Sequence, residues 1–269
     1  MLSTTENERL TSIMPGTPMG ELMRRYWHPI APSAELNDET PTKEVRLLGE
    51  DLVLFRSASG EIGLIEPSCP HRKANLSYGV PEPVGIRCSY HGWLYDVNGN
   101  CVEQPSEPAG SRFKDKVHLK AYKVEELGGI IFGYMGPEPA PLLPRWDTLT
   151  WEGHREVQIV ELPCNWLQCQ ENSLDPIHNE WLHGYMGNVV RTGKHELSPG
   201  RGKHLKIGID VFEHGIITRR VWGDQTEDHE DWKVGHPILF PNILRVGGGG
   251  MEEFKYRVPI DDTHTPAPV

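Results

Sequence analysis

The chain has 269 residues, including 28 glycines and 23 prolines, and its formal net charge is −11. This length suits one large domain or two ordinary ones, and the many turn-forming residues argue against a helical bundle. An acidic chain without a block of Lys and Arg lacks the positive field that nucleic acid requires, and no apolar run approaches the roughly 20 residues of a membrane helix.

The N-terminus carries Glu6, Glu8 and Arg9 where a secretory signal would be apolar. We therefore expect a cytoplasmic protein whose five cysteines are reduced or metal-bound rather than disulfide-linked. Residues 1–26 are predicted to form an N-terminal helical segment. Its clearest helix spans 17–26, with Thr17 as N-cap and Pro18 in the first turn.

Residues 27–136 are predicted to form a small antiparallel β domain. Short apolar runs alternate with turn residues, and Asn98-Gly99 between two such runs is a strong hairpin signal. The runs that we interpret as strands are 45–48, 52–55, 62–65, 93–95, 101–102 and 129–134.

A proline-rich linker, 137–145, is expected to separate this domain from a second one, 146–269. The second domain begins with a predicted strand over 155–162 and continues with a mostly helical stretch over 165–183. Further strands are predicted at 209–212, 216–218 and 254–258. The chain is thus predicted to be of the α+β class.

Four metal-binding side chains stand in two pairs in the first domain, Cys69 with His71 and Cys88 with His91. Two thiolates and two imidazoles suit zinc or an iron–sulfur centre. Zinc fingers usually pair like with like, whereas a [2Fe-2S] cluster with two Cys on one iron and two His on the other uses one of each from each loop. Zinc remains the alternative.

The sequence Cys-Pro-His-Arg, followed later by Cys-Ser-Tyr-His-Gly-Trp, resembles the Rieske cluster motif. The flanking Gly92 allows a close approach of the backbone, and Trp93 is expected to shield the cluster from water. Cys101, Cys164 and Cys169 have no such neighbours in the sequence and are interpreted as small packed residues.

A second group lies in the helical stretch, where Asp175, His178 and His183 suggest a non-haem iron site. Residues five apart on a regular α-helix lie about 140° apart, so the two histidines would not share a face. We therefore expect a break at Asp175-Pro176 that starts a new helix before His178, and we expect Gly184 to end that helix.

The pattern Asp-x₂-His-x₄-His after a Rieske motif is similar to the iron motif of Rieske non-haem iron oxygenases, the α subunits of aromatic ring-hydroxylating enzymes. Within that family the chain looks most like the phthalate-dioxygenase type. The shared stretches are 19–27, 47–52 and 165–168.

The resemblance implies a Rieske domain followed by a helix-grip catalytic domain. Cys69 and Cys88 would hold one cluster iron, and His71 and His91 the other. A mononuclear Fe(II) would be bound by His178 and His183. Asp175 would be the bridge between a cluster histidine of a neighbouring subunit and an iron-bound histidine, and Asn172 would lie near the iron.

The resemblance also implies partners. Electrons would come from NAD(P)H through a separate reductase of the flavin or ferredoxin type, and O₂ would be used to hydroxylate an aromatic or carboxylated small molecule. The family assembles as trimers or multiples of trimers.

One departure concerns the third iron ligand, which in the family is an aspartate well downstream of the two histidines. Here the chain stops at Val269, so we expect a truncated catalytic domain whose third ligand lies beyond that residue. An iron–sulfur electron-transfer protein or an inactive fragment is the main alternative, and a zinc-binding β module is the third.

Overall fold

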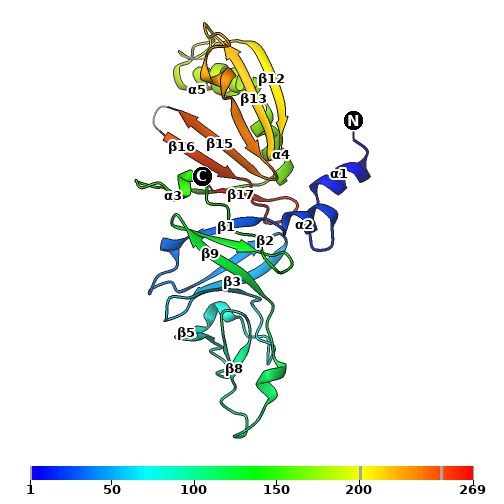
Figure 1. The fold of residues 1–269 in the computed structure, drawn as a ribbon, viewed down its shortest axis with the longest axis vertical. Coiled ribbons are helices and arrows are strands. Elements are labelled where there is room, and N and C mark those ends of the chain that lie inside the picture. The colour runs from blue at the N-terminus through cyan, green and yellow to red at the C-terminus, as the bar shows by residue number, and fades with distance from the viewer. Residues whose placement is uncertain (1, 200–201, 249–250, 269) are drawn as a thin grey trace. The chain divides into compact units, whose positions relative to one another are not determined.

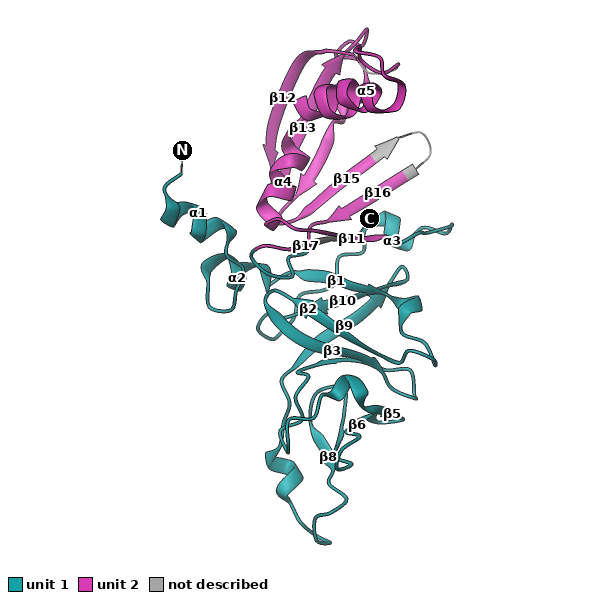
Figure 2. Cartoon of the chain, turned by 180° about the vertical axis from the view of Figure 1, so that it is seen from behind, with its two compact units in different colours: residues 1–157, 258–262 teal, residues 158–257, 263–269 magenta. Residues whose placement is uncertain are grey.

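The computed structural model describes residues 2–199, 202–248 and 251–268. The backbone divides into two units, residues 1–157 with 258–262 and residues 158–257 with 263–269 (Figure 2). Antiparallel sheets dominate both units, and the helices gather before the first sheet and within the second unit (Figure 1). The predicted α+β class is confirmed.

Two short helices precede the first sheet. Helix α1 (Thr4–Thr11) has a capping box in which Ser3 and Glu6 bond each other's backbone, and α2 (Pro18–Met23) is capped by Thr17 as predicted. The second helix ends at Met23 rather than at residue 26, because the N–H groups of Arg25 and Tyr26 bond to carbonyls three residues back, in a tighter turn than the α-helix.

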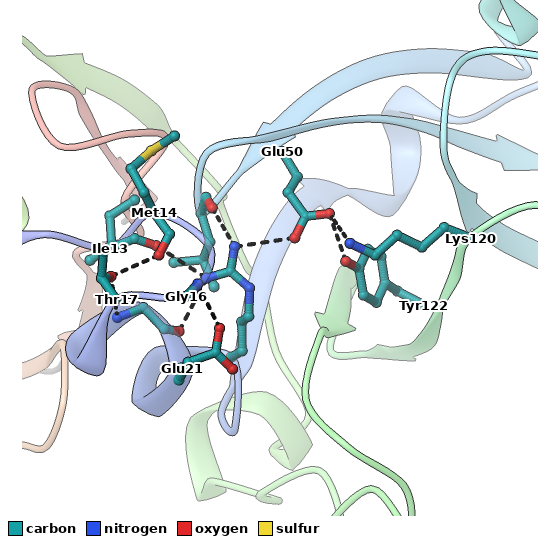
Figure 3. A network of polar contacts seen from close by, with 11 residues as sticks. Ile13, Met14, Gly16, Thr17, Glu21, Glu50, Lys120 and Tyr122 are labelled. Atoms are coloured by element: carbon teal, nitrogen blue, oxygen red, sulfur yellow. Dashed lines mark hydrogen bonds and ion pairs between the residues drawn. The ribbon is translucent and has the colours of Figure 1, made fainter.

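Arg24 joins the N-terminal segment to the sheet, and its partner Glu50 is labelled in Figure 3 beside Lys120 and Tyr122. Its guanidinium donates to the carbonyls of Ile13, Gly20 and Leu48 and pairs with the Glu50 carboxylate at 3.1 Å. Glu50 in turn accepts from the Tyr122 hydroxyl at 2.7 Å and pairs with the Lys120 ammonium.

A six-stranded antiparallel sheet forms the body of the first unit, in the order β1-β10-β9-β4-β3-β2. Leu52 to Phe55 are buried on both faces of β3, which explains their continuous apolar run. The tight turn between the second and third strands lies at Leu48-Gly49, where both residues have positive φ. The strands are β1 (Trp27–Pro32), β2 (Thr42–Leu47), β3 (Glu50–Arg56), β4 (Ile62–Ile65), β9 (Ala121–Leu127) and β10 (Ile130–Tyr134).

A smaller four-stranded sheet holds the Cys88–His91 loop between its second and third strands, and the Cys69–His71 loop lies between β4 and this sheet along the chain. Its strands follow one another as β5 (Val80–Glu82), β6 (Gly85–Arg87), β7 (Leu94–Tyr95) and β8 (Cys101–Glu103). The predicted Asn98-Gly99 hairpin joins the last two. Gly99 has φ +84°, and a side chain there would lie 2.3 Å from the Leu119 carbonyl, so only glycine fits. Short 3-10 turns flank the sheets at Ser33–Glu35, Leu76–Tyr78 and Phe113–Lys116.

Residues 137–145, all of them described, contain no helix or strand. The second unit begins at Gln158 rather than at 146. Helix α3 (Asp147–Thr150) explains the difference, because its buried Leu149 packs against Gly128 of the first unit. Val258 to Asp262 also belong to the first unit, where Asp262 accepts from the Ile13 N–H at 2.7 Å.

The second unit is a five-stranded antiparallel sheet in the order β12-β13-β14-β15-β16, beside a pair formed by β11 and β17. Helices α4, η4 and α5 join β11 to β12 along the chain. The bounds are β11 (Ile159–Leu162), α4 (Trp166–Leu174), η4 (Asn179–Met186), α5 (Gly187–Thr192), β12 (His204–Phe212), β13 (Gly215–Trp222), α6 (Glu230–Lys233), β14 (His236–Leu239), β15 (Ile243–Gly248), β16 (Met251–Tyr256) and β17 (Thr265–Pro268).

None of the helices in the described part of the chain is long and apolar enough to cross a membrane.

Candidate metal centres

Two loops of the first unit present the paired Cys and His residues on nearly the same backbone frame. In each loop the cysteine N–H donates to the carbonyl five residues ahead, and the cysteine carbonyl accepts from the N–H four residues ahead. The bonds are Cys69 to Ala74 and Lys73 to Cys69, and Cys88 to Trp93 and Gly92 to Cys88, all 2.8 to 3.0 Å. Lys73 and Gly92 both have positive φ, so the two loops turn in the same way.

This frame brings all four side chains together as a pair of thiols and a pair of imidazoles. The Cys69 and Cys88 side chains interact with each other, and these residues are 1% and 3% exposed within the apolar core. The rings of His71 and His91 lie 4.4 Å apart between centroids, nearer the surface. Two buried thiols and two imidazoles nearer the surface form the donor set of a [2Fe-2S] cluster in which Cys binds one iron and His binds the other.

The His71 ring is held in place by its neighbours. Its Nδ1 is buried and has no hydrogen-bond partner among the described residues, as expected of a nitrogen that binds a metal. The Trp93 indole stacks on the ring at 4.6 Å with an interplanar angle of 4°. Burial and the nearby His91 and Arg72 lower the pKa of His71, which favours the neutral imidazole that metal binding needs.

Tyr95 is a further polar neighbour that sequence reasoning missed. It is fully buried on β7, and its hydroxyl lies 3.2 Å from the Cys69 sulfur. Burial raises the pKa of the Cys69 thiol, so its thiolate depends on nearby donors or cations. A hydrogen bond to a cluster thiolate is one of the interactions that tune a metal centre.

The second candidate centre begins at a break between helices. Helix α4 ends at Leu174, and Asp175 is extended, with φ −82° and ψ 114°. The Asp175 carboxylate accepts from the N–H groups of Ile177 at 2.8 Å and His178 at 3.3 Å, so it caps the helical segment that follows. The break expected at Asp175-Pro176 is present.

The following helix is π-helical over Asn179–Met186, and this solves the spacing problem of the two histidines. The i→i+5 hydrogen bonds of a π-helix place residues five apart about one turn above each other. The rings of His178 and His183 accordingly lie 5.2 Å apart between centroids. The expectation that Gly184 ends the helix is wrong: it is buried inside the π-helix, and the helical path runs on to Gly193, whose φ of +71° stops it.

Glu180 fixes this π-helix to the sheet. It is only 7% exposed, and its Oε2 accepts from the backbone N–H of His204 at 3.0 Å and contacts the His204 Nδ1 at 3.2 Å. The backbone hydrogen bond lowers the pKa of Glu180, so the carboxylate is charged. Sequence reasoning missed this residue because its partner is 24 positions away.

A cavity of about 220 Å³ opens beside the two histidines within the second unit. Asn172 and Asp175 line it together with His178 and His183, so the four predicted residues of this site are brought together. Asp175 Oδ2 lies 3.4 Å from His178 Nδ1, and 47% of its side chain is exposed. In the described part of the chain, no group of three or more His, Cys, Asp or Glu side chains is arranged to hold one metal ion.

Residues 26–123 match the family model of the Rieske [2Fe-2S] domain. The chain contains a Rieske domain. Cys69, His71, Cys88 and His91 all lie inside the matched range, and this range lies within the first unit.

The Rieske domain belongs to a chain that resembles oxygenase subunits along nearly its whole length. It is 48% identical over 266 residues to the 5,5'-dehydrodivanillate O-demethylase oxygenase subunit of Sphingobium sp., which covers 97% of this chain and 61% of the relative. It is 36% identical to the phthalate 4,5-dioxygenase oxygenase subunit of Pseudomonas putida over 98% of this chain and 63% of the relative. The chain thus spans less than two thirds of the length of these curated relatives.

A solved structure shows the same fold. The oxygenase of a carbazole 1,9a-dioxygenase complex with ferredoxin superposes with a TM-score of 0.67 at 22% identity, covering 97% of this chain and 72% of that one. The predicted resemblance to Rieske oxygenase α subunits of the phthalate-dioxygenase type is confirmed.

The remaining cysteines are buried or half-buried, as the Rieske interpretation of the other two expects. Cys101 packs in the core of the first unit. Cys164 and Cys169 do have company, because their sulfurs lie 3.4 Å apart at the start of α4.

Proposed function

We propose that this chain acts as the oxygenase component of a multi-component Rieske non-haem iron oxygenase. The observation that carries the proposal is the His178–His183 pair, aligned by a π-helix beside a cavity, in a chain that also contains a Rieske domain. One centre for electron delivery and one for O₂ chemistry are what such an enzyme needs.

In this proposal Cys69 and Cys88 hold one iron of the cluster, and His71 and His91 hold the other. His178 and His183 hold a mononuclear Fe(II). When bound, the cluster supplies one-electron transfer and the Fe(II) supplies the site for O₂. The chain's own residues orient these groups: Trp93 stacks on His71, and Glu180 fixes the helix that carries both iron-binding histidines.

Asp175 would be the bridge to a second copy of the chain. Its carboxylate already touches His178, and its exposed half faces solvent, where a cluster histidine of a neighbouring copy could bind it. This arrangement requires an assembly, and a homotrimer or a multiple of it is proposed. Asn172, which lines the same cavity, would lie near the iron.

We further propose that the substrate is an aromatic or carboxylated small molecule that is hydroxylated or demethylated with O₂. The names of the relatives support this class, since they include a dehydrodivanillate O-demethylase and a phthalate dioxygenase. Electrons would come from NAD(P)H through a reductase of the flavin or ferredoxin type, and the ferredoxin complex of the carbazole oxygenase supports such a partner.

The proposal is tested by purifying the chain anaerobically and measuring absorbance, reduced-state EPR, and iron, sulfide and zinc content. We expect a brown protein with a Rieske EPR signal and iron in excess of the cluster. Colourless protein containing zinc would refute the cluster. A cluster without iron at the histidine pair, and without O₂ uptake when a reductase and the relatives' substrates are added, would instead indicate an electron-transfer protein.

A further inference from the structure

The sheet side of the cavity carries an unusual concentration of positive charge. Arg220 on β13, Lys255 on β16 and Arg257 just after β16 all line it, whereas Asp175 is the one carboxylate among its described lining residues. Both Asp175 oxygens already accept from the backbone N–H groups of the next helical segment. Outside the lining, Glu253 pairs with Lys255 at 3.3 Å and Asp231 interacts with Arg220, so the uncompensated positive charge of this wall lies mainly at Arg257.

Arg257 is the least compensated of these cations. It is half-buried, its Nε is buried without a hydrogen-bond partner among the described residues, and no described carboxylate lies within ion-pair distance of it. Burial lowers the pKa of Arg257, which reflects the cost of holding its charge away from water. A bound anion would offset that cost and accept a hydrogen bond from the unpartnered Nε–H.

The same face of the sheet continues into an apolar strip. Residues directly opposite each other in an antiparallel pair point to the same face, and Ile207 lies opposite Arg220 while Ile209 lies opposite Thr218. Thr218 and Arg220 line the cavity, so the two isoleucines, exposed by 38% and 60%, extend its wall along β12. The cavity wall formed by β13 and β16 thus carries the cationic side chains, and the adjoining surface of β12 is apolar.

We propose that Arg220, Lys255 and Arg257 form a carboxylate-binding subsite that orients an apolar, singly or doubly charged acid against the His178–His183 pair. This inference rests on the proposed function and deepens it, because it assigns substrate selection to particular side chains. The planar guanidinium of Arg257 can bind both oxygens of a carboxylate at once, and the strip of Ile207 and Ile209 contacts the ring.

Calorimetric binding to the purified chain at low ionic strength tests the subsite. The probes are 3-chlorobenzoate, its uncharged counterpart 3-chlorobenzamide, and acetate and inorganic phosphate as anions without an apolar body. We expect the wild-type chain to bind the benzoate at least about tenfold more tightly than the benzamide. Acetate and phosphate should bind more weakly than the benzoate, because they cannot use the apolar strip.

Arg257→Gln should remove most of the preference for the acid and leave benzamide binding unchanged, while Arg257→Lys should retain part of it. Arg245→Gln is the matched control, because Arg245 alternates with the cavity-lining Leu244 and Val246 on β15, faces the other side of the sheet, and pairs with Glu252 at 2.8 Å. If circular dichroism shows that Arg257→Gln does not fold, Lys255→Gln replaces it, with a smaller expected loss because Lys255 also pairs with Glu253 at 3.3 Å.

Equal binding of acid and amide by the wild type, including no binding of either, would overturn the subsite, and so would an equal loss in the Arg245 control. Phosphate binding as tight as that of the benzoate would indicate a general oxyanion site and refute the carboxylate assignment. No oxygen, reductase or turnover enters these measurements. A preference for the acid in an inactive chain would therefore contradict only the proposed function, and turnover without the preference would contradict only the subsite.

Discussion

The imidazole of His178 faces that of His183 at 5.2 Å only because the helix between them is π-helical. On a regular α-helix the two rings would point about 140° apart. A π-helix is rare and tends to occur at functional sites, and here the buried Glu180 bonds it to β12. The geometry of the histidine pair therefore depends on Glu180, although Glu180 is not itself one of the proposed metal ligands.

Glu180→Gln should weaken iron binding at the histidine pair. The amide keeps the size of the side chain but loses the charge that the His204 N–H stabilises, so the π-helix is held less firmly. Orienting partners of metal ligands typically contribute 10- to 100-fold in affinity, and we expect a loss in that range. Fe(II) titration of the metal-depleted chain measures it. Glu196→Gln, an exposed carboxylate beside Lys194, is the control, and an equal affinity in both variants would contradict the positioning role.

Cys88→Ser should abolish the cluster, whereas Cys101→Ser should retain it. Both cysteines are buried in the same apolar core, but the Cys88 side chain is within hydrogen-bond contact of Cys69, whereas the Cys101 sulfur lies 3.6 Å from the Glu103 carbonyl. His91→Ala should likewise remove the cluster and leave iron at His178 and His183 less affected. Visible absorbance and sulfide content measure the cluster, and total iron content measures what remains at the histidine pair. An intact cluster in the Cys88 or His91 variant would refute the ligand assignment.

Tyr95→Phe should lower the reduction potential of the cluster without removing it. The Tyr95 hydroxyl donates to the Cys69 sulfur, and this bond is stronger when the reduced cluster carries more negative charge. If the difference between the two states is about 1.4 kcal/mol, the shift is about 60 mV for a one-electron couple. Potentiometric titration followed by EPR checks it. Tyr90→Phe, an exposed ring beside His91, should leave the potential unchanged, and a similar shift in both variants would argue against the hydrogen bond.

Arg24→Met should destabilise the first unit strongly. Arg24 is 6% exposed, and its removal takes away the guanidinium that pairs with Glu50 and donates to three backbone carbonyls, although Glu50 keeps Lys120 and Tyr122 as partners. Because hydrogen bonds to a charged group typically contribute about 1.5–3 kcal/mol, we expect a loss of about 3 kcal/mol. Arg46→Met, which breaks an exposed pair with Asp51, should cost about 1 kcal/mol or less. Urea unfolding followed by tryptophan fluorescence compares them, and similar losses would show that the Arg24 network adds little.

Much of the first unit can be predicted from sequence because its signals are local. The Asn98-Gly99 turn, the strand at 62–65 and the capping by Thr17 each depend on a few adjacent residues. The spacing of the two Cys–His pairs is equally local, so the order of the residues alone is enough to indicate a metal-binding role.

The second unit is less predictable because its site is built by distant residues. Glu180 meets His204 across 24 positions, and the cations of the cavity come from β13 and from the end of β16. A π-helix has no simple sequence pattern, so the presence of a glycine at 184 misplaces the end of the helix. The start of the second unit at Gln158 likewise depends on a contact between distant residues, because Leu149 packs against Gly128 within the first unit.

His28 makes the stability of the first unit depend on pH. The side chain is fully buried on β1, its Nε2 lies 2.9 Å from the Met23 carbonyl, and burial lowers the pKa of His28 to about 4. In the unfolded chain the same group titrates near 6.5, so between these values the unfolded state binds a proton that the folded state excludes. Stability should fall as the pH drops from about 6.5 to about 4, by about 3 kcal/mol, and this contribution should level off below pH 4.

His28→Gln separates this contribution from the other acid-sensitive groups. The amide can donate to the Met23 carbonyl but does not titrate, so its free energy of unfolding should lose less between pH 7.5 and pH 4.5 than that of the wild type. Urea unfolding at the two pH values measures both proteins. Because each carries the same carboxylates and the same metal-binding residues, those contributions cancel in the comparison. A parallel loss in the two proteins would mean that His28 is protonated as readily in the folded state as in the unfolded one.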